Sequence, residues 1–132
     1  MSNMIHKSVL LIGYRSSIPM PQYFRERFGT PEEIRAKLAH DQHRIQRAGI
    51  TSVMYQLNEL DQEKGLRELE GLLRKGNYDA IGIGAGVRLH PDYTALFETI
   101  VNMCRTIAPS APLMFNDGPD GSADTSEWNL EL

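Results

Sequence analysis

The segment IGIGAGVRLHPD, which spans residues 81–92, contains the residues best suited to chemistry. Its glycines stand where an apolar run passes into a helical pattern, and a glycine backbone can approach an anion closely. Arg88 can hold a phosphate or a carboxylate through paired, charge-assisted hydrogen bonds. The pattern therefore predicts an anion site around Gly84, Gly86 and Arg88. The alternative is that the glycines serve helix packing and a turn, and that Arg88 is solvated.

A second polar group follows the first apolar run, in the segment GYRSS. About sixteen residues separate the end of this apolar run, at Tyr14, from the first expected helix, and so long a connection is typical of a lid or a binding segment. Arg15 would supply a second cation, and Tyr23, Phe24 and Phe28 would close over a ligand or cover the sheet end or a subunit interface. The expected ligand-binding residues are Gly13, Tyr14, Arg15, Ser16, Gly84, Gly86, Arg88 and Asn116.

Two residues are candidates for proton transfer. His90 stands at the mouth of the expected site, where an imidazole could act as an acid or a base, although it could equally be an imperfect helix N-cap. Asp41 falls in the middle of the apolar stripe of its helix. Because a buried carboxylate needs a partner, Asp41 is either a structural clamp on the segment that contains Arg15, or a catalytic acid or base.

No metal site is expected, and no cofactor is indicated. His40 and His43 point away from the apolar stripe of their helix, which indicates a solvated face. The acidic segment from Asp120 lacks the glycine of a calcium loop, because Thr125 occupies that position. Asn116 follows the last apolar run, where its amide would orient a ligand or magnesium, or would form a turn.

Four apolar runs carry or flank these residues. Because they show no clean alternation, they predict strands buried on both faces. The segments between them have helical periodicity, which predicts a parallel sheet. The expected fold is one α/β domain over residues 1–132, a three-layer sandwich with a four-stranded parallel sheet of order 2-1-3-4. The expected strands are VLLIGY from Val9, TSVMYQL from Thr51, YDAIGIG from Tyr78 and PLMFN from Pro112. The expected helices run from Pro31, capped by Thr30, to Gly49, from about Leu60, capped by Asn58, to Gly76, and from Pro91 to Ala108.

Composition excludes several classes of function. A formal net charge of −3 leaves no basic footprint for nucleic acid, so no nucleic-acid partner is expected. The single cysteine, Cys104, cannot form an intrachain disulfide, which is compatible with a reducing compartment. The apolar run from Val9 to Ile12 is too short for a signal peptide or a membrane span. We therefore expect a soluble, cytoplasmic protein with no membrane partner.

Five short segments carry a resemblance to known proteins: LLIG at 10–13, GAGVR at 84–88, LFE at 96–98, AP at 108–109 and FND at 115–117. Through them the chain resembles a family of short bacterial α/β proteins to which no activity is assigned. The resemblance implies an α/β fold and a cytoplasmic location, and it gives no role to any residue. The architecture is also similar to that of receiver domains and flavodoxins.

The sequence lacks the functional residues that both of those classes of protein need. At the ends of the first and third strands, where a receiver domain needs acidic residues, the chain has Gly13-Tyr14 and Gly84-Ala85. The segment YRSSIPMPQ has two serines and no glycine, unlike a flavin phosphate loop.

Three hypotheses for function remain open, and the least specific is that the protein is a partner subunit whose site is completed by another protein. In the first, the protein binds a small anionic metabolite, a phosphate ester or a carboxylate, where the first and third strands end side by side. In the second, it is a noncatalytic homodimer that pairs through an edge strand such as PLMF or through the loop with Tyr23 and Phe24.

Overall fold

The computed structural model describes residues 7–14, 22–57 and 61–116, together with Gly121, Ser126 and Leu130. Four parallel strands form one sheet in the order β2-β1-β3-β4. This arrangement confirms the predicted α/β class, the parallel sheet and its strand order. The strands are β1 (Lys7–Tyr14), β2 (Ile50–Leu57), β3 (Ala80–Ile83) and β4 (Leu113–Phe115).

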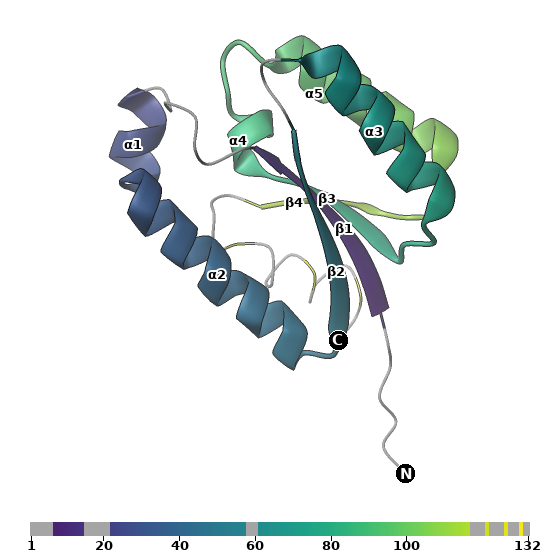
Figure 1. The fold of residues 1–132 in the computed structure, drawn as a ribbon, viewed down its shortest axis with the longest axis horizontal. Helices are drawn as coiled ribbons and strands as arrows, with labels where there is room; N and C mark the ends of the chain where they lie inside the picture. Colours follow the sequence, from purple (N-terminus) through teal and green to yellow (C-terminus); the bar gives the residue numbers. More distant parts are fainter. Residues whose placement is uncertain are drawn as a thin grey trace.

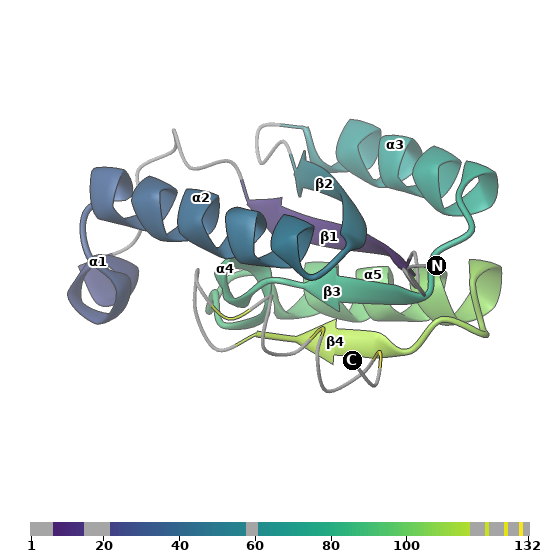
Figure 2. The same cartoon turned by 90° about the horizontal axis from the view of Figure 1, so that it is seen from below.

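Helices cover both faces of the sheet, which gives the expected three layers. Figure 1 and Figure 2 show α2 (Pro31–Arg47) on one face, and α3 (Gln62–Lys75) and α5 (Thr94–Ile107) on the other. The short helix α4 (Ala85–Arg88) follows β3 directly. The remaining helix, α1 (Gln22–Phe28), packs against the start of α2 near the carboxyl ends of the strands.

The core is divided by the sheet into two layers. Alternate residues of a strand point to opposite faces, so Leu10 and Ile12 pack toward α3 and α5, while Val9 and Leu11 pack toward α2. All four side chains are at most 6% exposed. The two central strands are therefore buried on both faces, which is why their sequences are almost continuously apolar.

The ends of α2 lie where the sequence predicts them. Thr30 Oγ1 accepts a hydrogen bond from the N–H of Glu33 at 3.1 Å, and the Glu33 carboxylate accepts from the N–H of Thr30 at 3.3 Å. This reciprocal pair is a capping box, and Pro31 occupies the first turn. At the other end, Gly49 has φ of +81°, the left-handed conformation that glycine adopts without strain.

The start of α3 differs slightly from the prediction. The helix begins at Gln62, and its N-cap is Asp61, whose Oδ1 accepts from the N–H of Lys64 at 3.1 Å. Asn58, the predicted cap, lies outside the described residues. Gly76 ends the helix as predicted.

The predicted start of α5 at Pro91 is wrong. A helical turn, α4, forms immediately after β3, and a turn follows it before α5 begins at Thr94. Within that turn the N–H of Asp92 donates to Nδ1 of His90 at 3.1 Å. Pro91 lies in this turn because the chain must reverse between two helices rather than enter one.

The connection between β1 and α2 contains a helix where the sequence predicts a loop. This helix, α1, ends at Gly29, whose N–H donates to Arg25 O at 2.9 Å and whose φ is +100°. Phe28 is buried with Ile34 and Ala85, so it covers the end of the sheet. The side chains of Tyr23 and Phe24 lie outside the described part of the chain.

Within the residues described, no helix is both long enough and apolar enough to cross a membrane.

Candidate functional site

A small cavity of about 60 Å³ lies at the carboxyl ends of the two central strands, under the middle of α2. Parallel α/β sheets bind their ligands beyond the carboxyl ends of strands, where the winding of the chain reverses, and here that point lies between β1 and β3. The described residues that line the cavity are Leu11, Ile12, Gly13, Leu38, Met54, Gln56, Gly82, Gly84 and Asn116.

Strand register places four of these residues side by side across the sheet. Gly13 pairs with Gln56 of β2. On the other side, the N–H of Gly84 donates to Ile12 O at 2.9 Å, which continues the pairing of β1 with β3 by one residue. A Cβ built on Gly84 would lie 3.9 Å from the Cα of Gly13 and 3.9 Å from Nδ2 of Asn116. The cavity floor is thus a pair of glycines between two side-chain amides.

The two glycines are not required by backbone conformation. The described glycines with positive φ are Gly29 and Gly49, and neither Gly13 nor Gly84 is among them. A Cβ on Gly13 would meet no described atom within 4 Å, and one on Gly84 would make only ordinary contacts, the nearest at 3.4 Å to a carbonyl oxygen. Alanine would therefore fit at both positions, and its methyl group would occupy the cavity.

Asn116 connects the cavity to α4. Its Oδ1 accepts a hydrogen bond from the N–H of Ala85 at 3.0 Å, and this bond satisfies one N–H of the first turn of α4. With Oδ1 turned to Ala85, the Nδ2 group of the same amide lies on the side of Gly84. The sequence predicts that Asn116 orients a ligand. It does not predict that Asn116 anchors α4, because that contact joins residues 31 positions apart in the chain.

Arg88 reaches the same residue from the other end of α4. Its Nη2 donates to the backbone oxygen of Asn116 at 2.7 Å, and its Nε is buried without a hydrogen-bond partner in the described part of the chain. Arg88 is not part of the cavity wall. Its positive charge instead stands beside the end of β4, one hydrogen bond away from a residue that does line the cavity.

The two proton-transfer candidates lie away from the cavity wall. The ring of His90 stacks on that of Tyr93, with centroids 3.9 Å apart and planes inclined by 17°. Its Nδ1 accepts from Asp92, so His90 takes part in the turn between α4 and α5. Asp41 is 2% exposed and lies on the inward face of α2, as the helical pattern predicts. Neither lines the cavity.

The other predicted site residues divide into two groups. Gly86 lies in α4, next to Ala85, and it is not in the cavity wall. Tyr14 ends β1, paired with Leu57, but its side chain lies outside the described residues, as do Arg15 and Ser16. The structure thus brings Gly13, Gly84 and Asn116 together. Met54 and Gln56 also line the cavity, because β2 pairs in register with β1. The sequence did not predict these two residues.

No cluster of three or more potential metal ligands occurs among the residues described. Both His40 and His43 are exposed. Cys104 is buried in the layer formed by α3 and α5, and burial raises the pKa of its thiol to about 11. Such a thiol is a packing group rather than a nucleophile, because the reactive form is the thiolate.

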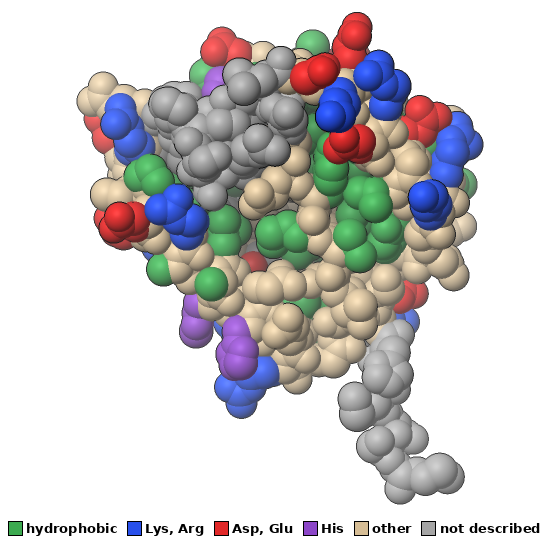
Figure 3. Space-filling view, viewed as in Figure 1, with side chains coloured by type: hydrophobic (Ala, Val, Ile, Leu, Met, Phe, Trp, Pro, Cys, Tyr) green, Lys and Arg blue, Asp and Glu red, His purple; other side chains and the backbone are tan. Residues whose placement is uncertain are grey.

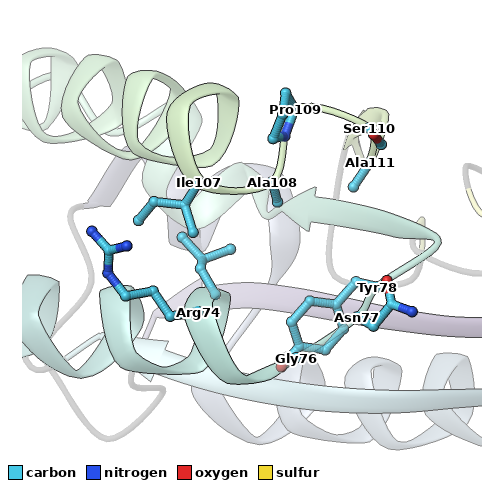
Figure 4. A pocket seen from close by; sticks show the side chains of 10 residues that line it. Arg74, Gly76, Asn77, Tyr78, Ile107, Ala108, Pro109, Ser110 and Ala111 are labelled. Carbon is cyan, nitrogen blue, oxygen red and sulfur yellow. The ribbon is translucent and has the colours of Figure 1, made fainter.

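A second hollow, of about 400 Å³, lies at the opposite end of the molecule. Figure 4 shows it between the end of α3, which carries Arg74, and the end of α5, which carries Ile107. Arg74 is already bound to Glu70 on its own helix, at 2.8 Å. Tyr78 donates to Leu72 O at 3.3 Å. This hollow is larger, but it lies at the amino edge of the sheet, away from the strand ends where α/β sheets hold ligands.

Comparison of the chain with known protein families and with curated proteins found no match in either. The predicted relationship to short bacterial α/β proteins therefore stays a prediction, and we infer the function from the residues of the site itself.

Proposed function

We propose that this protein binds a small ligand that places a compact anionic group, a carboxylate or a phosphate, in the cavity between Gly13 and Gly84. The observation that carries the proposal is the pair of glycines itself. Gly13 lies within β1, where glycine is less stable than alanine by roughly 0.5–1 kcal/mol. Gly84 is the N-cap of α4, a position that accepts glycine more readily than alanine. Since neither a positive φ nor a close described contact requires glycine at Gly13, the open space beside it is what this residue provides.

The size of the cavity supports a compact group. A cavity needs roughly 10–15 Å³ of open space to hold one water molecule, so one of about 60 Å³ has room for a group the size of a carboxylate or a phosphate. The remainder of a larger ligand has to lie outside. The apolar walls formed by Leu38 and Met54 would pack against carbon atoms that adjoin the polar group.

The charge distribution supports an anion. The described wall contains the amide side chains of Gln56 and Asn116 and no carboxylate. Amide N–H groups are hydrogen-bond donors, and hydrogen bonds to a charged acceptor are stronger than those between neutral groups. The guanidinium of Arg88, bonded to the Asn116 carbonyl, adds a positive charge next to this wall.

Amide NMR spectroscopy of the ¹⁵N-labelled protein tests the proposal. Inorganic phosphate and acetate are titrated at constant ionic strength, with sodium chloride as the reference. We expect saturable shifts of the amide signals of Gly13 and Gly84 and of the side-chain NH₂ of Asn116. Gly71 and Gly76, which lie in and after α3, provide internal controls that stay in place.

Gly84→Ala and Gly13→Ala are the variants that decide the site, because each adds one methyl group where the structure has room for it. We expect both to fold and to weaken binding at least tenfold. Gly71→Ala is the matched control, since a Cβ there also meets no described atom within 4 Å but lies on α3. Unaltered binding in both cavity variants, or saturable shifts confined to another part of the molecule, would overturn the proposal.

A further inference from the structure

The strand β2 forms one edge of the described sheet, with β1 as its neighbour on one side. All eight of its residues pair with β1, from Ile50 to Leu57. An edge strand presents a row of N–H and C=O groups that can pair with another strand. The opposite edge, β4, contains only three residues, so β2 offers much the longer row.

The sequence of β2, ITSVMYQL, has none of the features that usually prevent an edge from pairing. It contains no lysine or other charged residue and no proline, and its pairing with β1 has no bulge. Val53 and Met54, at its centre, are 37% and 42% exposed, and they point to opposite faces of the sheet. Large apolar side chains thus stand at the middle of an unprotected edge on both sides.

Much of the described surface around this edge carries no charge. Figure 3, which views the molecule with β2 in front, shows apolar and neutral polar atoms beside and below its centre, with a small acidic spot among them and most acidic and basic side chains around the margin. On the α2 side, the amide of Gln42 donates to the hydroxyl of Ser52. On the α3 side, the hydroxyl of Tyr55 lies within hydrogen-bond distance of the Glu68 carboxylate, at 2.9 Å, and of Gly65 O, at 3.0 Å.

We propose that two copies of this chain pair antiparallel through β2, around a two-fold axis perpendicular to the sheet, to form a continuous eight-stranded sheet. A second copy fits this edge because the strand itself carries no charged residue and therefore does not repel its own copy. Two-fold pairing is also the commonest symmetry of soluble assemblies. It sets α2 beside α2 of the partner and α3 beside α3 of the partner.

The size of the face agrees with a stable dimer. Eight residues of strand are about 26 Å long, and three stacked layers at about 10 Å each make the edge about 30 Å deep. Their product, about 800 Å² for each copy, matches the area that one partner buries in a standard protein interface.

In an antiparallel pair, opposed residues lie on the same face, so the two-fold axis passes midway between a residue and its own copy. Each residue of β2 defines one such register. The central residues Val53 and Met54 are the two that allow long pairing. Met54 and Gln56 also line the ligand cavity, so the partner strand would cover the outer wall of that cavity. This last consequence rests on the proposed function, whereas the dimer does not.

Sedimentation equilibrium without added ligand tests the dimer directly. The chain has a mass of 14.9 kDa, and we expect the wild type to have twice that mass. Val53→Lys places two like charges near the axis and should raise the dissociation constant at least tenfold. Asn102→Lys, on the exposed face of α5, is the control that keeps the dimer. A wild-type monomer at all concentrations, or a dimer that Phe115→Lys on β4 dissociates and Val53→Lys does not, would overturn the proposal.

Cysteine crosslinking gives a second measurement that does not depend on the folding of the lysine variant. In Val53→Cys or Met54→Cys, whichever lies on the axis, the two cysteines fall within the Cα separation that a disulfide accepts. We expect one of them to form a crosslinked dimer under mild oxidation. The wild type is the control, because Cys104 is 1% exposed. No crosslink in either variant contradicts the pairing. Phosphate titration of the Val53→Lys variant then assesses the ligand site separately.

Discussion

Asn116 and Ala85 are joined by a hydrogen bond of 3.0 Å from the backbone N–H of Ala85 to Oδ1 of Asn116. The bond ties the end of β4 to the first residue of α4, and it turns the other half of the amide toward the cavity. Arg88, at the far end of α4, donates a second hydrogen bond to the same residue, through the backbone oxygen of Asn116. One asparagine therefore positions a helix and contributes to the wall of the candidate site.

Removing the Asn116 amide should destabilise the protein. Asn116→Ala leaves the N–H of Ala85 without its acceptor, and we expect the free energy of unfolding to fall by about 1 kcal/mol. Asn116→Asp keeps an acceptor at the start of a helix and should recover most of that loss. Urea denaturation measures both, with Asn102→Ala, an exposed site on α5, as the control. Equal losses for Ala and Asp would show that the acceptor is not what matters.

The capping box of α2 gives a second prediction. Thr30→Ala removes the acceptor for the N–H of Glu33 and should lower the free energy of unfolding by about 1 kcal/mol. Thr30→Ser retains the hydroxyl and should stay close to the wild type. Urea denaturation curves compare the three proteins. A serine variant as unstable as the alanine variant would assign the effect to the lost methyl group instead of the hydrogen bond.

Two glycines should respond to alanine in opposite directions. Gly71→Ala adds a methyl group to α3 where no described atom lies within 4 Å, and it should stabilise the protein by roughly 0.5–1 kcal/mol. Gly49→Ala places a Cβ on a residue with φ of +81° and should destabilise it by about 1 kcal/mol. The midpoints of thermal unfolding measure both. The same sign of change for the two variants would contradict the backbone assignment.

Cys104 should make stability depend on alkaline pH. Burial raises the pKa of its thiol in the folded state from 9.0 to about 11. Between these values the unfolded chain loses the proton while the folded chain keeps it, so stability present below pH 9 is lost as the pH rises. The difference in unfolding free energy between the wild type and Cys104→Ala should therefore narrow from neutral pH to about pH 11. A constant difference over this range would contradict the prediction.

Local sequence signals succeed where the decisive interactions are themselves local. Thr30, Pro31 and Gly49 determine α2 because a cap forms with residues three or four positions away. Local signals fail at Pro91, because its sequence pattern resembles a helix start although the residue lies in the turn before α5. A helical turn at Ala85–Arg88 comes first, and the N–H of Ala85 in it donates to Asn116, a contact that no local pattern contains.

The sequence alone determined the α/β class and the inward position of Asp41, because apolar periodicity decides these features. The strand order, expected because it is the commonest for a small parallel sheet, was decided by the tertiary structure. The sequence also placed glycines at both central strand ends. Only the tertiary structure decided that Gly13 and Gly84 lie beside one cavity while Arg88 turns to the end of β4. Register and side-chain direction join residues far apart in the chain, and they follow from the packing of the whole sheet.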